Sequence, residues 1–182
     1  MADRPLMFRT QPTVTSTASP EAAYDVIADL RNHLVWSGER AEDDGFKMLT
    51  LEAPDGPATV GTTFTSSGTA GKETFHDRSV VTEASRPNVF VIETDARLER
   101  KSAETWEAHF SHRYDIVPDG DGSRIVYTET VERVNYLPYW LKPGIRTIFR
   151  PWVNRADRKQ LRNLARLAEE RSSEGSAPRA DD

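Results

Sequence analysis

Cysteine is absent from all 182 residues of the chain. Its absence excludes disulfide bonds, a cysteine nucleophile and any metal site built on thiolates, and it fits a reducing compartment, so we expect a cytoplasmic protein. Long apolar runs are missing as well. No stretch approaches the roughly 18 uninterrupted apolar residues that cross a membrane, and the first residues lack the apolar segment of a signal peptide. We therefore expect the protein to be soluble.

Recognisable catalytic motifs are also lacking. The segment GTAGKE at 68–73 superficially resembles a phosphate-binding loop, but that motif would require Gly at position 66 and Ser or Thr at position 73, where the chain has Ser66 and Glu73. Neither a Gly-x-Ser-x-Gly sequence nor an ordered Ser/His/Asp set stands out. We interpret residues 68–71 as a turn.

Histidine is scarce, with four residues in the chain. His109 and His112 are spaced as H-x-x-H, which on a helix would suggest a metal pair. They lie in a strand-like segment, where residues three apart point to opposite faces and cannot share one ion. We therefore expect neither a metal site nor a cofactor.

Outside one segment, Lys and Arg are fewer than Asp and Glu. Residues 142–171 hold 9 Lys/Arg against 3 Asp/Glu, whereas residues 1–141 hold 14 against 23. The basic segment is either an ordinary solvated face that balances an acidic body or a transient contact with an anionic membrane. Nucleic-acid binding is not expected, because the acidic remainder would repel phosphates.

The first half of the chain predicts a strand followed directly by a helix. Residues 12–17 are rich in β-branched residues and predict a first strand. Ser19, Pro20 and Glu21 then supply an N-cap, a proline at the first helical position and an acid at the positive helix end. Apolar residues follow at helical spacing, and residues 32–36 predict a second short helix or turn. The apolar positions are Ala23, Val26, Ile27 and Leu30.

The middle of the chain predicts consecutive antiparallel strands. β-branched and aromatic stretches alternate with turn residues, and the DGDG sequence before Ser123 suits a tight hairpin. The predicted strands are 46–52, 61–67, 72–84, 88–96, 103–117 and 123–134.

The last element is a long helix through about Glu170, with Pro151 expected to kink or break it. Its apolar positions are Ile145, Ile148, Phe149, Trp152, Ala156, Leu164 and Ala168. The chain is therefore predicted to be one α+β domain in which this helix covers the sheet. We expect a domain at 12–171, an N-terminal extension at 1–11 and a disordered tail at 172–182.

Several stretches, in this order and spacing, resemble the START-like (SRPBCC) superfamily, in its polyketide cyclase/dehydrase and lipid-transport branch. They are ASPEAAYDVIADLRNHLVW (18–36), VGTTF (60–64), VVTEASRPNVFVI (80–92), RYDIVPDGDGSRIVYT (113–128) and LRNLARLAEER (161–171). The resemblance implies a helix-grip fold, in which a curved seven-stranded antiparallel sheet wraps around a long C-terminal helix and two short helices follow the first strand. It also implies a cavity for a small apolar ligand between the sheet and that helix.

Strand alternation sorts the candidate ligand-binding residues. The inward face of 105–116 is expected to carry aromatic side chains with polar tips, a composition typical of a ligand pocket, although an ordinary core would look the same. Trp36 is either a wedge at the cavity rim or plain core. The ligand-binding candidates are Trp36, Phe64, Trp106, Phe110, His112, Tyr114, Ile148 and Trp152.

The catalytic candidates are His112 and Tyr114, together with His76 and Arg78 if their face of strand 72–84 points inward rather than to solvent. Desolvation would keep His112 neutral and able to act as a base. The first functional hypothesis is binding of a small hydrophobic ligand, lipid or polyketide-like. The alternatives are a polyketide cyclase or dehydratase acting by acid–base chemistry and a protein–protein adaptor that uses the basic helix.

Overall fold

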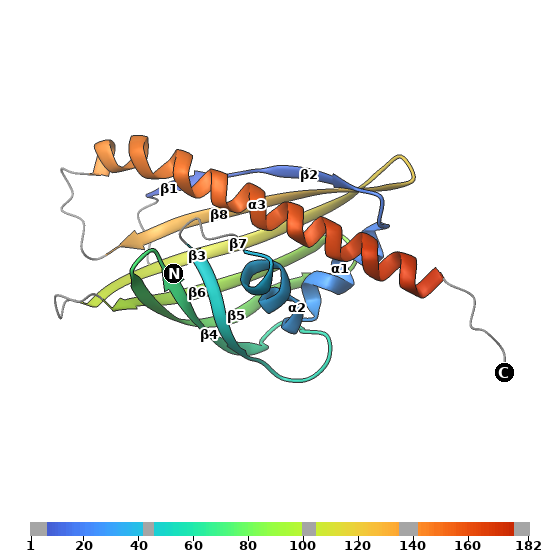
Figure 1. The fold of residues 1–182 in the computed structure, drawn as a ribbon, viewed down its shortest axis with the longest axis horizontal. Helices are drawn as coiled ribbons and strands as arrows, with labels where there is room; N and C mark the ends of the chain where they lie inside the picture. The colour runs from blue at the N-terminus through green and yellow to red at the C-terminus, as the bar shows by residue number, and fades with distance from the viewer. Residues whose placement is uncertain (1–6, 42–45, 100–104, 135–141, 177–182) are drawn as a thin grey trace.

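The computed structural model describes residues 7–41, 46–99, 105–134 and 142–176 (Figure 1). Two edge segments are followed by a helical stretch, six strands and one long helix. In chain order these are β1 (Phe8–Thr10), β2 (Thr13–Ser16), α1 (Pro20–Ala28), α2 (Arg31–Leu34), the π-helical turn η1 (Val35–Glu39), β3 (Phe46–Glu52), β4 (Thr63–Ala70), β5 (Glu73–Ser85), β6 (Val89–Glu99), β7 (Thr105–Asp119), β8 (Gly122–Val134) and α3 (Lys142–Ser176).

The strands form one antiparallel sheet in the order β1-β8-β7-β6-β5-β4-β3, with β2 also paired to β8. β1 and β2 thus share one edge position, separated around Pro12, which has no backbone N–H to donate. Eight segments therefore fill seven positions, and the predicted helix-grip fold is confirmed. The paired strand β1 lies within the stretch that we expected to be an N-terminal extension.

The predicted start of the first helix is confirmed. The Ser19 side chain accepts a hydrogen bond from the Ala22 backbone N–H at 3.2 Å, and Pro20 occupies the first turn. After α1, the chain continues through α2 into η1, where the Arg40 N–H donates to the Val35 carbonyl at 2.9 Å. This wide turn carries Trp36 back toward the sheet.

The predicted turn at 68–71 is wrong in its extent. β4 continues to Ala70, and the reversal falls at Gly71, whose φ of +66° favours glycine. Gly68 lies within the strand instead. A Cβ there would approach the Phe75 ring at 2.5 Å, so glycine lets this aromatic ring lie across β4.

The long helix continues through Pro151, so of the expected kink or break the break does not occur. Pro151 is on the exposed side of α3, where water can bond the carbonyl that its missing N–H leaves free. The helix also extends to Ser176, five residues into the stretch expected to be a tail. The tail's remaining residues, 177–182, lie outside the described part.

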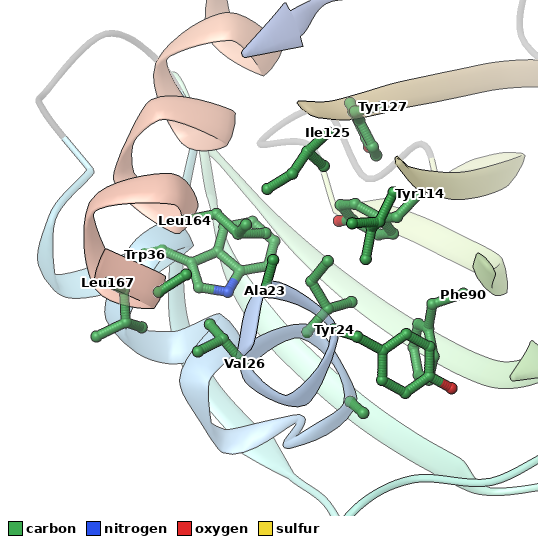
Figure 2. Packing of buried hydrophobic residues seen from close by; sticks show 14 of the residues in the cluster. Ala23, Tyr24, Val26, Trp36, Phe90, Tyr114, Ile125, Tyr127, Leu164 and Leu167 are labelled. Carbon is green, nitrogen blue, oxygen red and sulfur yellow. The ribbon is translucent and has the colours of Figure 1, made fainter. Parts of the chain in front are cut away.

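Buried side chains concentrate where α1 and η1 meet the sheet and the C-terminal half of α3 (Figure 2). α3 lies along β1, β2 and β8 and contacts α1 and η1, rather than resting on the middle strands (Figure 1). The tightest packing is therefore at one end of the inner face. A second, smaller cluster joins Met7, Phe8 and Val131, with the partly buried Phe110 of β7 and Val153 of α3 packed against it.

Candidate functional site

The inner face of β7 carries the predicted alternating set. Tyr114 and Ile116 are buried in the core. Trp106, Phe110 and His112 point to the same face but are only half-buried. The interior is thus filled at the end of β7 and retains accessible surface toward its beginning.

A hydrogen bond joins this face to β8. The His112 Nδ1 lies 2.7 Å from the Tyr127 hydroxyl, and the rings of Tyr114 and Tyr127 are 4.9 Å apart. Register explains the contact, because His112 is opposite Glu129 and Tyr114 is opposite Tyr127. The Tyr127 hydroxyl also hydrogen-bonds Glu129, the next inward-facing residue of β8.

Two carboxyl groups extend this contact across the interior. Glu129 is 9% exposed and Asp157 of α3 is 6% exposed, and their side chains are hydrogen-bonded to each other. Tyr127 is hydrogen-bonded to Glu129, and the Thr10 hydroxyl donates a hydrogen bond to Asp157 Oδ2 at 2.5 Å. The resulting polar chain runs from β7 through β8 to α3 and β1: His112, Tyr127, Glu129, Asp157 and Thr10.

Burial sets the protonation of this polar chain. Desolvation raises the pKa of Glu129 well above its usual range and also raises that of Asp157, so the two carboxyls share a proton at neutral pH. Burial likewise raises the pKa of Tyr127 and lowers that of His112 to about 4. Tyr127 and His112 are therefore neutral.

The order of donors follows from these states. Protonated Glu129 donates to Asp157, and the Tyr127 hydroxyl donates to Glu129. The Tyr127 oxygen is then left to accept from Nδ1–H of His112. This assigns His112 the Nδ1–H tautomer, with Nε2 as a hydrogen-bond acceptor.

Trp36 and Phe64 belong to the core, contrary to their expected role on an accessible binding surface. Both are buried, and Trp36 lies among Ala23, Val26 and Leu164 (Figure 2). The Trp36 ring is 4.6 Å from that of His33, whose Nε2 is 2.9 Å from the Ile27 carbonyl. Trp36 is therefore plain core, as the second reading of the sequence had it.

His76 and Arg78 face solvent, so the pocket that would have joined them to His112 does not form. The His76 side chain is 51% exposed and lies 3.9 Å from Glu99. Both residues line an open hollow of about 710 Å³ on the outer face of β3–β7. Side chains of both charges surround this hollow, on the opposite side of the sheet from the polar chain.

The inward face of β5 carries Asp77 instead. Asp77 alternates with buried Phe75, Ser79 and Val81, and it accepts a hydrogen bond from its cross-strand partner Ser66. Burial raises its pKa to about 7. The sequence contained a signal for this orientation, because apolar Phe75 and Val81 share the face of Asp77. Apolar Val80 lies on the opposite face, however, so either face could have been the inward one.

The helix candidates differ from expectation. Trp152 is 46% exposed and does not face the interior. The side chain of Ile148 lies outside the described residues. Among the described side chains of α3, the buried ones are Asp157, Leu161, Leu164, Ala165, Leu167 and Ala168.

A small pocket of about 150 Å³ lies between α3, η1 and the start of β3. Phe46 lines it and also stacks on Phe75 of the inner face, with ring centroids 4.6 Å apart. Its rim is basic, with Arg40, Lys159, Arg162 and Arg166. Cations therefore surround this pocket, whereas the polar chain beneath the helix is built on carboxyls.

His109 is on the outer face, as predicted from its spacing with His112. Its ring nitrogens each lie 2.9 Å from a carboxylate, Asp95 at Nδ1 and Glu93 at Nε2. Within the described residues, no group of three or more His, Asp or Glu is arranged to hold a metal ion. The described helices also include none that is long and apolar enough to cross a membrane.

The curved antiparallel sheet closed around a long C-terminal helix defines a helix-grip protein. A profile of the polyketide cyclase/dehydrase and lipid transport family matches residues 7–169, and the chain belongs to this family. The START-like resemblance of the sequence is thereby confirmed. No curated protein is significantly similar to the chain in sequence.

Solved structures share the fold at low sequence identity. An uncharacterized protein from Rhizobium leguminosarum is 13% identical with a TM-score of 0.59, over 90% of this chain and 99% of its own. Protein CV1439 from Chromobacterium violaceum is 13% identical with a TM-score of 0.56, over 88% and 97%. TTHA0849 from Thermus thermophilus is 16% identical with a TM-score of 0.55, over 93% and 100%. At these identities the likeness shows the fold alone.

Proposed function

We propose that the protein binds a small, largely apolar ligand between the inner face of β7 and α3, with a polar group of the ligand at His112. The observation that carries the proposal is the half-buried row Trp106, Phe110 and His112 on the inner face of β7. Binding sites of this kind are mostly apolar with a few fixed polar groups. Here the fixed group is His112, held by Tyr127 at 2.7 Å.

Filling the interior tests this proposal. Ala108 lies on the same face between Trp106 and Phe110, so Ala108→Phe adds a ring where the ligand would lie. We expect the variant to lose uptake of a fluorescent apolar probe by tenfold or more while its unfolding midpoint stays near that of the wild type. Arg78→Ala, on the outer face, is the control and should bind normally. Uptake by Ala108→Phe equal to that of the wild type would refute the site.

A second candidate is acid–base catalysis in the same place. It is favoured by the polar chain itself, because a neutral His112 is linked through Tyr127 to a protonated carboxyl, an arrangement that can move a proton. His112 Nε2 would act as the base toward a carbonyl-bearing, polyketide-like substrate. His112→Ala separates the two functions: a catalyst loses about 10²–10⁴ in rate, whereas a carrier changes its affinity only a few fold.

We propose that α3 contacts an anionic membrane. Exposed Trp152 stands beside a groove lined by Arg155, Arg158 and Arg162, the composition of an interfacial helix. Each cation near such a surface contributes roughly 1 kcal/mol. Arg155→Glu with Arg158→Glu should therefore lower binding to phosphatidylserine vesicles more than tenfold, whereas Arg78→Glu with Arg124→Glu should not. An equal loss of vesicle binding in both double variants would show an effect of net charge alone and would refute a specific contact through α3.

A further inference from the structure

The inner face carries a second polar group, Asp77, that is separate from the polar chain at His112. Asp77 pairs with Ala96 of β6, and Ala96 pairs with Ala108 of β7. Its cross-strand neighbours are Ser66 and Ala96, and Ala108 follows Ala96, so the carboxyl has small side chains beside it on the inner face. Its Oδ1 is buried and has no hydrogen-bond partner among the described residues.

An unpartnered buried carboxylate oxygen is costly, so its persistence points to a group that it binds. Ser66 on the neighbouring strand donates a hydrogen bond to the same carboxyl group. Ser79 and Thr94, also on the inner face, satisfy each other at 2.9 Å. Among the described residues of this part of the face, Asp77 is therefore the one that keeps an unpartnered acceptor.

Strand geometry gives the spacing of the two polar groups. His112 is four residues beyond Ala108, the residue aligned with Asp77, and two strands away from it. With about 3.3 Å per residue and about 4.8 Å per strand, the two side chains are rooted about 16 Å apart. The inward residue midway between them is Thr94, whose hydroxyl is bonded to Ser79, and apolar Phe110 lies beside it on β7.

The charge of the interior limits what can lie along this surface. Its acidic side chains include the carboxyls of Asp77, Glu129 and Asp157, its His112 is neutral, and the described inner faces of β4–β8 include no Lys or Arg. The two open positions, His112 Nε2 and Asp77 Oδ1, are both hydrogen-bond acceptors. A carboxylate or phosphate lying on the described inner faces of β4–β8 would meet acceptors and carboxyl groups, with no cation of these faces to pair it.

We propose that the ligand is an uncharged, elongated molecule with a hydroxyl-type hydrogen-bond donor near each end, one bound by His112 and the other by Asp77. This inference rests on the proposed binding function and specifies its ligand class. It excludes free fatty-acid anions from this site.

Three probes of equal chain length test the ligand class: decanediol with a hydroxyl at each end, decanol, and decanoate. Each is titrated against a bound fluorescent apolar dye at neutral pH. We expect decanediol to bind about tenfold more tightly than decanol, the effect of one added hydrogen bond to a partly charged acceptor, and decanoate to bind most weakly. Equal affinities for decanediol and decanol, or decanoate binding as tightly as decanol, would overturn the inference.

Two substitutions locate the second anchor. Asp77→Ala should reduce the affinity for decanediol to that for decanol while leaving the affinity for decanol unchanged. Asp77→Leu, which is closer in size to the wild type, provides the same test if the alanine variant is unstable. Arg78→Ala is the matched control on the outer face of the same strand. An unchanged decanediol preference in both Asp77 variants refutes the role of Asp77. Failure of the dye and all three probes to bind the wild type refutes the proposed function itself.

Discussion

The two ends of the inner sheet face differ in how they are used. At the α1 end, Phe90 and Ile116 are completely buried, and the Phe90 ring meets that of Tyr24 edge-on at 5.8 Å. At the other end, Phe110 and His112 remain half-buried although they point the same way from the same strand. One continuous strand, β7, therefore forms part of a closed core and part of an accessible surface.

Polar groups follow the same division. The core end buries His33 singly against a backbone carbonyl. Beside the half-buried His112, in contrast, the buried side chains of Tyr127, Glu129, Asp157 and Thr10 are linked into one chain that crosses from the sheet to α3. If the proposed binding site is correct, stability and binding are carried by different lengths of the same elements. Substitutions at the two ends should consequently have different thermodynamic signatures.

The largest contrast is expected from two matched phenylalanine truncations. Phe90→Ala should lower the free energy of unfolding by about 3–5 kcal/mol, because it leaves a cavity in a closed core. Phe110→Ala should cost less than half as much and should weaken binding of an apolar probe. Urea denaturation and probe titration measure both. Equal losses of stability would show that the interior is closely packed along its full length.

The core end was accessible to sequence reasoning because its signals are local. The Ser19 cap, the apolar spacing of α1 and the alternation of β7 each specify an orientation without knowledge of distant partners. Tyr114 and Ile116 face inward as the alternation predicted. The approximate positions of the long strands also follow from turn residues that separate them.

The polar chain was not predicted, because its members are paired only in three dimensions. Asp157 lies on the buried side of α3. The apolar residues Trp152 and Ala156 had suggested that a different side of the helix faces the sheet, but Trp152 is exposed. Glu129 alternates correctly with Ile125, yet a glutamate on an inward face is expected only when its partner is known. Asp77 was missed because both faces of its strand mix apolar and polar residues.

A pH experiment sharpens the comparison at the core end. Burial lowers the pKa of His33 to about 4 from an ordinary 6.5, so between these values the unfolded chain binds a proton that the folded chain does not. Stability contributed by neutral His33 is complete above 6.5 and is lost as the pH falls to 4. Asp77, with its pKa raised to about 7, acts in the opposite sense.

Comparison with a variant isolates the His33 contribution. His33→Gln should be less stable than the wild type at pH 7, and this gap should shrink by about 3 kcal/mol on acidification to pH 4. Unfolding free energies measured across that range test it. A gap that stays constant with pH would mean that His33 is protonated to the same extent in both states.

A smaller effect is expected where the polar chain meets the sheet edge. Thr10→Val preserves the shape of a buried side chain but removes the hydroxyl that donates to Asp157, and it should cost about 1–3 kcal/mol. Thr13→Val, on the exposed side of the same edge, is the control and should be nearly neutral. A neutral result for Thr10→Val would show that Asp157 does not depend on this donor.

The smallest effect on stability should come from Glu129→Gln. Because burial keeps Glu129 protonated, the amide can replace both its donation to Asp157 and its acceptance from Tyr127, and the change should be below about 1 kcal/mol at pH 7. The nitrogen chemical shifts of His112 should still report the Nδ1–H tautomer. A loss above about 2 kcal/mol would indicate that Glu129 is ionised. A shift to the Nε2–H tautomer would reverse the assigned direction of donation between His112 and Tyr127, and would move the acceptor away from the ligand side of the imidazole.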